Sequence, residues 1–447
     1  MNLRDPLKFL IVVYLVLLVI EGALRKWIFP EISALLLVVR DPVALLIYLV
    51  AAQKGHLWQS RQMGVWTLLA LAIIILGIVQ LSLGLPLPVM LFGLRTYLLH
   101  WPLVFVMGSC LTCKDVVWIG KWTLLVSIPM TFLIVKQFQS SPTSDINATA
   151  GGPGGLQIFS AMGHIRPAGT FSFATGPATF YPIATAFLLY GYWRKAFPRW
   201  LLTAGLLAII AALPVSGSRS LVLSCALVLV MGLAVGLGGK GGLSTLAQVA
   251  VPVVAGFYML SMLEFFDEGK AVFQARWDVA NEAGGGVEGA IFQRSINGFL
   301  QPFNALAGAS VLGEGIGLGT NAGGAYTTGR IAFLLGESDW QRIFLEAGLI
   351  LGVAFIAFRV RIVVEIGLRA FSNMRSGRPF AWLIFAGTAL NTVFGQTGQP
   401  TNLGFVVAGA GLALAALKEQ APTNHRVAHP WARHLSIAGA GREGASE

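Results

Sequence analysis

The run LKFLIVVYLVLLVIEGAL, from Leu7 to Leu24, decides the fold class of this chain. A helix needs about 20 mostly apolar residues to cross a bilayer, and this run supplies nearly that number. A signal peptide has a similar apolar segment, but it ends in a cleavage site of small residues. Here the run ends in Arg25, Lys26 and Trp27 instead. We therefore predict that residues 7–24 form a transmembrane helix.

The composition extends this prediction to the rest of the chain. Of the 447 residues, 55% are apolar and only 11% are charged, whereas about 25% of the residues in a soluble protein carry charge. The mean hydropathy is +0.73. Too few polar residues remain to cover a water-soluble globule. We predict an all-α, polytopic membrane protein.

The apolar segments also predict how the chain is organised. About twelve are long enough to span a membrane: residues 7–24, 32–52, 64–83, 88–112, 116–138, 173–193, 200–217, 220–238, 243–263, 341–358, 379–395 and 401–417. Residues 139–172, which are rich in Gly, Ser and Pro, and residues 264–340, which hold many of the acidic residues, are too polar for spans. We predict one membrane domain, residues 1–417, and a disordered polar tail, residues 418–447.

The positions of the Lys and Arg residues predict the orientation, because basic residues concentrate on the cytoplasmic side of membrane proteins. With the N-terminus inside, most of the 31 Lys and Arg residues, Arg359 and Arg361 among them, fall on that side. Both termini are then cytoplasmic, and residues 139–172 and 264–340 are two large external loops. The net charge of +11 is scattered between apolar spans, which argues against a nucleic-acid partner.

The cysteines indicate no metal site. Cys110 and Cys113 have CxxC spacing, but no second pair of ligands accompanies them. All three cysteines, including Cys225, lie in or beside apolar segments as ordinary small membrane residues. We expect no metal, no cofactor and no disulfide.

Charged residues within predicted spans are candidates for function, because a charge in the hydrocarbon costs at least ~2.5 kcal/mol. Arg40 and Asp41 lie in the middle of the second span. Since adjacent residues on a helix do not face each other, we expect their partners on other helices. Arg95 and His100 lie in the fourth span. These residues either order the bundle or line a binding site, and Arg95 is a candidate for contacting an anionic substrate.

Several further motifs fall on the predicted external side. Gly and Pro residues break the helix between Arg166 and Pro177. Arg219 lies in a tight turn, SGSRS, from which it either reaches lipid headgroups or binds a ligand. The run GEGIGLG, residues 313–319, either exposes backbone N–H groups as an anion nest or is simply flexible. The stretch GESDW, residues 336–340, then leads into the next span.

Four segments, in this order along the chain, resemble the O-antigen polymerase/ligase superfamily of bacterial envelopes. They are RPAGTFSFATGPATFYPIA from Arg166, SGSRS around Arg219, LGEGIGLGT from Leu312 and ESDWQRIFLEAGLILGV from Glu337. The resemblance extends from about residue 90 to residue 417. The earlier segment EGALRKWIFP, from Glu21, is similar to members of the exopolysaccharide type.

This resemblance implies a donor glycan on a polyprenyl diphosphate and its transfer to an acceptor sugar at the periplasmic face. It also implies that two external arginines hold the diphosphate, and the matching positions are Arg219 and Arg294. Arg166 and Arg95 are additional candidates for this role. Guanidinium groups suit it, because negative charge develops on the diphosphate leaving group in the transition state.

The same resemblance leads to candidates for a general base. Ligases of this superfamily carry a histidine just before the fourth motif, and this chain has none there. Glu337 and Asp339 are the nearest carboxylates, and a carboxylate can accept a proton from a sugar hydroxyl if it is positioned for it. The missing histidine favours a polymerase over a ligase.

Aromatic residues within 264–340 are candidates for binding the glycan, since aromatic rings stack on the apolar faces of sugars. We select Trp277, Tyr326 and Trp340, although each residue alone could instead anchor the loop at the membrane interface. The expected partners are a polyprenyl-diphosphate-linked oligosaccharide and membrane lipids, with a flippase and a chain-length regulator as further candidates.

The function expected from these residues is polymerisation of lipid-linked repeat units into O-antigen or exopolysaccharide at the bacterial inner membrane. One alternative is a ligase that transfers glycan to another acceptor such as lipid A core. The other is a transporter of polysaccharide or lipid-linked sugar, although no internal repeat of the kind found in transporters is evident.

Overall fold

The computed structural model describes residues 1–151, 155–237, 251, 253–284, 310–329, 335 and 338–420. Within these residues the chain is α-helical, and Phe159 and Ile165 form an isolated β-bridge. Seven described segments are long and apolar enough to cross a membrane: Pro6–Ile28, Pro30–Gln53, Arg61–Ser82, Leu87–Cys110, Cys113–Gln139, Arg219–Gly236 and Asp339–Arg375. The prediction of an all-α, polytopic membrane protein is confirmed at this level. The total number of spans and their orientation stay predictions.

Most of the other predicted spans coincide with further helices. The shorter apolar helices are α9 (Arg199–Val215), α16 (Phe380–Phe394) and α17 (Pro400–Ala416). Helix α8 (Thr175–Arg194) covers the predicted segment 173–193. The predicted segment 243–263 lies partly outside the described residues.

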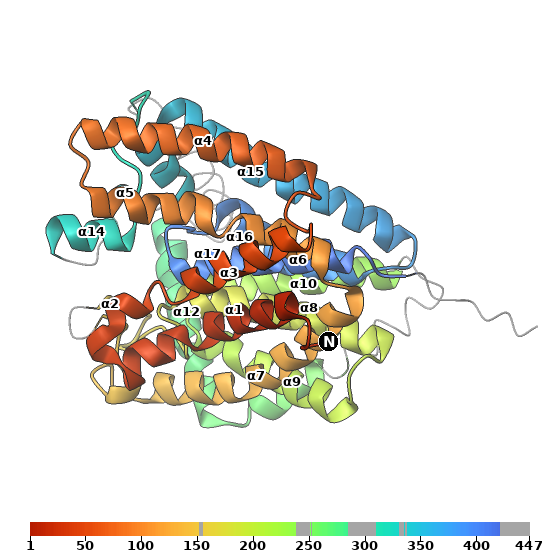
Figure 1. The fold of residues 1–447 in the computed structure, drawn as a ribbon. Coiled ribbons are helices and arrows are strands. Elements are labelled where there is room, and N and C mark those ends of the chain that lie inside the picture. Colours follow the sequence, from red (N-terminus) through yellow and green to blue (C-terminus); the bar gives the residue numbers. More distant parts are fainter. Residues whose placement is uncertain are drawn as a thin grey trace, which may run out of the picture.

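Helix α17 forms the centre of the bundle. It packs on α6 (Pro102–Cys110) and on α16, and α16 also packs on α8 and on α15 (Asp339–Arg375) (Figure 1). A glycine permits one of these close approaches, because a Cβ on Gly409 would lie only 2.3 Å from Thr388 Cγ2. Small residues at helix interfaces are common in membranes, where close packing drives helix association.

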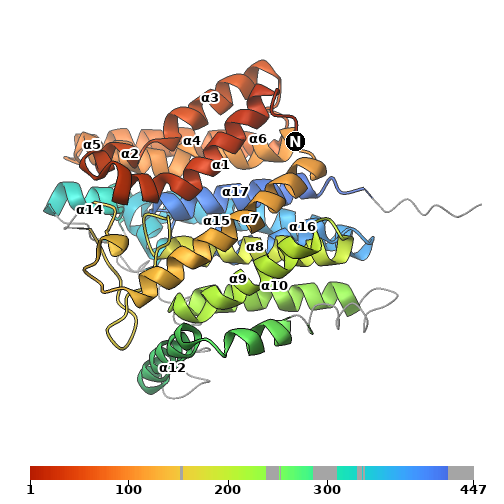
Figure 2. The same ribbon diagram turned by 90° about the horizontal axis from the view of Figure 1, so that it is seen from below.

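The remaining helices flank this centre. Helix α1 (Pro6–Ala23) packs on α3 (Arg40–Gln53), α4 (Arg61–Ser82) on α15, α10 (Arg219–Leu237) on α8, and both α7 (Cys113–Gln139) and α12 (Glu264–Gly284) on α9. Figure 2 shows α3 and α12 at opposite edges of the bundle.

The two ends of the bundle carry different parts of the chain. Met1 and residue 420 lie at one end, which we call the terminal end (Figure 2). The segment 140–174, α12 and α14 (Asn321–Thr328) lie at the opposite end, which we call the loop end. Both ends of the described chain therefore lie on one side of the bundle.

Two cysteine variants test which end faces the cytoplasm. Ser141, at the loop end, and Ser376, at the terminal end, are both exposed. If the terminal end is cytoplasmic, a membrane-impermeant maleimide should label Ser141→Cys in intact spheroplasts and Ser376→Cys only after permeabilisation. A parent without the three native cysteines, which are all free, is the reference. The opposite labelling pattern would invert the predicted orientation.

The region 264–340, predicted as an external loop, contains helical segments, and its external position stays a prediction. Two helices, α12 and α14, lie within it, and Asp339 and Trp340 already belong to α15. The polar side chains that argued against a span are compatible with an amphipathic helix. In α12 Phe266 and Val272 are buried, whereas Asp267 and Glu268 are exposed.

Helix α15 extends well beyond the predicted span 341–358, and it ends at Arg375. Arg359, predicted to lie in a cytoplasmic segment, is fully buried within this helix. Its guanidinium donates to the carbonyls of Thr392 (2.9 Å) and Gly395 (3.0 Å). An arginine is a poor marker of the end of a span when the bundle supplies buried acceptors.

The first residues of the predicted tail belong to the bundle. Lys418 Nζ donates to the carbonyls of Ser109 (2.8 Å) and Leu111 (2.9 Å). Glu419 is buried and accepts from Arg194 at 2.8 Å. The rest of the predicted tail, residues 421–447, lies outside the described residues.

Candidate functional site

Three arginines from separate segments converge at the loop end. Arg166 lies in the segment before α8, Arg219 is the first residue of α10, and Arg276 lies in α12. They are close enough for the positive charges of Arg276 and Arg219 to act on the Arg166 guanidinium. We call these three residues the arginine cluster.

A tight turn and a loop hold this cluster together. Arg166 Nη2 donates to Ser218 Oγ at 3.0 Å, in the turn between α9 and α10. Gly217 in that turn has φ +55°, and a Cβ there would lie 2.4 Å from Ser160 Oγ. Glycine therefore suits both the left-handed backbone and the close approach of the loop. Arg276 Nη1 lies 3.4 Å from the Phe159 carbonyl of the same loop, which it donates to.

The electrostatics of the cluster favour an anion. Burial, together with the neighbouring positive charges of Arg276 and Arg219, lowers the pKa of Arg166 to about 10. Arg166 is still cationic at neutral pH. Among the described residues it makes no ion pair, and its buried Nε has no hydrogen-bond partner. An anion beside Arg166 would accept charge-assisted hydrogen bonds from its guanidinium.

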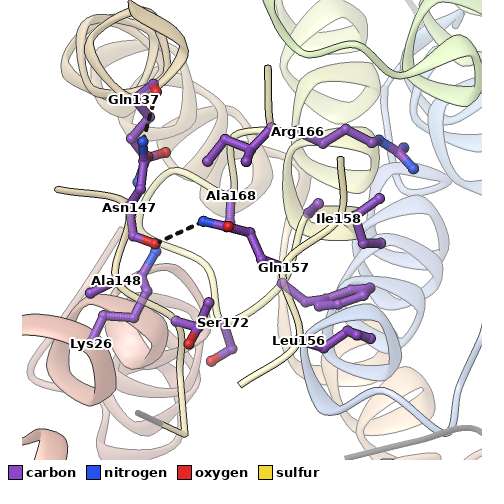
Figure 3. A pocket seen from close by; sticks show the side chains of 14 residues that line it. Lys26, Gln137, Asn147, Ala148, Leu156, Gln157, Ile158, Arg166, Ala168 and Ser172 are labelled. Carbon is purple, nitrogen blue, oxygen red and sulfur yellow. Dashed lines mark hydrogen bonds between the residues drawn. The ribbon is translucent and has the colours of Figure 1, made fainter. Parts of the chain in front are cut away.

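A cavity of about 440 Å³ also lies at the loop end. Its charged lining residues are Glu21, Arg25 and Arg95, and Tyr326 and Gln399 contribute to its wall. A smaller cavity of about 30 Å³ shares Leu156, Ser172 and Phe173 with it. Lys26 and Arg166 both line this smaller cavity, and Figure 3 shows them on opposite sides of it. The smaller cavity therefore lies beside the larger one, and Arg166 contributes to its wall.

Two π-helical turns position the charged residues of the larger cavity. The turn Leu24–Ile28 carries Arg25 and Lys26, and the turn Arg95–Leu99 carries Arg95. Such turns are rare, and they occur frequently at functional sites. The sequence offered a partial signal for them, since in both places charged residues interrupt an apolar run.

Ion pairs join these residues across helices, as predicted. Arg40 Nε lies 3.0 Å from Glu21 Oε2 on α1, and Asp41 accepts from Arg95 Nε at 2.5 Å. His100 Nε2 lies 3.2 Å from Asp41 Oδ1. The prediction that Arg40 and Asp41 have partners on other helices is confirmed. Arg95 both orders the bundle and lines the cavity, so the two roles left open for it are compatible.

Asp339 lies in a closed, buried network rather than in a cavity wall. It accepts from Arg342 at 2.9 Å, from Arg359, and from the backbone N–H (3.0 Å) and hydroxyl (2.9 Å) of Thr397. Arg342 continues the network to Glu346 at 2.5 Å. Asp339 is 2% exposed and does not line the 440 Å³ cavity. These contacts place Asp339 inside the bundle, and its catalytic role stays a prediction.

Trp340 likewise faces the interior of the bundle. Its Nε1 donates to the Val393 carbonyl at 2.7 Å, and its ring stacks on Phe394 with centroids 5.1 Å apart. It is 7% exposed. This packing leaves little surface for the sugar predicted to bind there. Tyr326, by contrast, is exposed and lines the larger cavity.

The glycine run neither forms an open anion nest nor acts as a simple flexible link. The Gly319 N–H donates to Glu346 Oε1, and the Ile316 N–H donates to Gln80 Oε1, both at 2.8 Å. Gly313 has φ +70°, and a Cβ there would lie 2.3 Å from the Glu346 carbonyl. The glycines therefore allow the run to pack against α15, whose carboxylate and backbone occupy its N–H groups.

Of the remaining predicted site residues, Trp277 is described by the structure, whereas Arg294 and Glu337 are not. Trp277 lies in α12, half-buried, with its ring 6.0 Å from that of Phe273 and directly after Arg276. Arg294 and Glu337 lie outside the described residues. Sequence reasoning did not select Arg276, although its spacing of three and four residues from Phe273 and Val272 indicates the buried face of α12.

Comparisons with known proteins give no family for this chain. No family model, no curated protein and no solved structure matches it.

Proposed function

We propose that this protein is a glycosyltransferase that joins polyprenyl-diphosphate-linked oligosaccharide repeat units into a polysaccharide at the external face of the bacterial inner membrane. The arginine cluster carries this proposal. In it Arg166, Arg219 and Arg276 come together from three segments at the loop end, and Arg166 makes no ion pair among the described residues. Transfer of a glycan from a diphosphate requires fixed positive charge to stabilise the leaving group.

The neighbouring cavity supports the other part of the proposed substrate, the glycan attached to the diphosphate. Its wall combines aromatic rings, Phe92, Phe173 and Tyr326, with the polar side chains of Thr96, Ser172 and Gln399. Sites for small polar ligands commonly combine apolar surface with a few placed polar groups. A sugar presents both an apolar ring face and hydroxyl groups, so it suits this lining.

We assign the general base of the proposed reaction to Glu337, with Asp339 as the alternative. The Asp339 carboxylate already accepts hydrogen bonds from two arginines and from Thr397. Glu337 lies immediately before Ser338, whose hydroxyl accepts from the Gln341 N–H and caps the start of α15. In the sequence it is two residues before Asp339, the first residue of α15.

A reaction with a single type of substrate tests the proposal. Purified protein given only lipid-linked repeat unit should produce a ladder of oligomers, because one molecule serves as donor and another as acceptor. If the protein transfers nothing until lipid A core is added, and then makes one product per acceptor, it is a ligase. Movement of the repeat unit across vesicle membranes without any new glycosidic bond would make it a transporter.

A further inference from the structure

Lys26 is a buried cation without an ion-pair partner among the described residues. Its side chain is 5% exposed. Its ammonium donates to the Gly169 carbonyl and lies 4.4 Å from the centre of the Trp27 ring. An ammonium has three N–H donors, and a buried charge is costly unless it is paired and hydrogen-bonded. An anionic ligand would supply what the described protein does not.

The nearby carboxylates, Glu21 and Asp41, already form ion pairs with arginines. Arg25 and Arg40 share Glu21, at 3.4 and 3.0 Å, and Arg95 pairs with Asp41. The two carboxylates thus face four cations, Arg25, Lys26, Arg40 and Arg95. Of these cations, Lys26 lines the smaller cavity, and Arg25 and Arg95 line the larger one beside it.

The Lys26 pocket is distinct from the arginine cluster. In Figure 3 the Lys26 side chain enters from one side, whereas the Arg166 guanidinium points away from the pocket. The Arg166 guanidinium contacts Ser218 instead. One cation therefore faces the small cavity, while the cluster faces the α9–α10 turn and α12.

We propose that Lys26 forms a second anion-binding site, which holds an oxyanion of the acceptor glycan while the arginine cluster holds the donor diphosphate. This inference rests on the proposed polymerase function, in which two lipid-linked glycans bind at once. The oxyanion is either a carboxylate of an acidic sugar or the diphosphate of the acceptor lipid. Both accept charge-assisted hydrogen bonds from an ammonium.

Calorimetric titration of the full-length protein in nanodiscs tests this site, with glucuronate, glucose and farnesyl diphosphate as probes. We expect Lys26→Met to weaken one anion site by about 10- to 100-fold, the usual effect of losing a charged hydrogen bond, and to leave the other unchanged. A carboxylate site binds glucuronate but not glucose. A phosphate site makes farnesyl diphosphate bind twice per wild-type chain and once per Lys26→Met chain.

A second variant tests the site even if Lys26→Met fails to fold. Leu156 lines both cavities and is 40% exposed, so Leu156→Asp adds a negative charge at the mouth with Lys26 in place. It should weaken the same site, and Leu156→Asn should not. Wild-type affinity and stoichiometry in both Lys26→Met and Leu156→Asp would overturn the inference.

The same proteins separate this inference from the proposed function. If the wild-type protein builds polymer and Lys26→Met and Leu156→Asp leave the acceptor KM unchanged, only the Lys26 site is refuted. If the wild-type protein makes no glycosidic bond from any lipid-linked donor, the proposed function fails, and the titration alone then decides whether Lys26 binds an oxyanion.

Discussion

Replacing Arg219 by lysine is expected to lower the rate of polymer formation by about 10- to 100-fold, and replacing it by alanine by about 100- to 1,000-fold. Lysine keeps the positive charge but loses the planar fork that contacts two oxygens of a phosphate at once. The rate is measured with purified protein and lipid-linked repeat unit. Arg166→Lys and Arg276→Lys should show losses of the same kind, because the three residues act on one bound group.

The matched control is Arg369→Lys. Arg369 has a side chain that is 58% exposed, and its one ion pair among the described residues is with Glu365, one helical turn away, at 3.4 Å. Arg369→Lys should retain wild-type activity, since exposed pairs of this kind contribute little. Wild-type rates in all three cluster variants would show that the cluster does not contact the diphosphate, and the proposed function would lose its main support.

The sequence predicted the elements of this fold better than their boundaries. Apolar runs identify membrane helices because the bilayer selects for length and hydropathy alone. The same rule fails where the bundle itself solvates polar groups. Arg359 ended a predicted span, yet it is buried in α15 by backbone carbonyls and Asp339. Gly348 also departs from a local rule, because it has φ +73° inside α15. The backbone of Val311 packs against it there.

The candidate site was predictable only in part, because it depends on contacts between distant segments. Arg166 and Arg219 could be selected separately, because Arg166 begins a Gly- and Pro-containing motif and Arg219 lies in a tight turn between two apolar runs. Their association with Arg276 requires α12 to pack against α9, which no local pattern specifies. The surroundings of Asp339 were unpredictable for the same reason. Its partners Arg359 and Thr397 are 20 and 58 residues away along the chain.

Asp339→Asn is expected to destabilise the folded protein by about 3–5 kcal/mol, the usual cost of removing one partner from a buried ion pair. The change leaves Arg342 and Arg359, both buried, with Glu346 as the one remaining carboxylate of the network. Unfolding by SDS, followed for the purified protein, measures the effect.

Glu314→Gln is the control for this experiment, because Glu314 is an exposed carboxylate at the same end of the bundle. It should change the stability by less than about 0.5 kcal/mol. The comparison also separates structure from catalysis. A structural Asp339 predicts that Asp339→Asn loses stability and farnesyl diphosphate binding together. If Asp339→Asn instead keeps wild-type stability and binding but cannot turn over donor, then Asp339 is the general base and Glu337 is not.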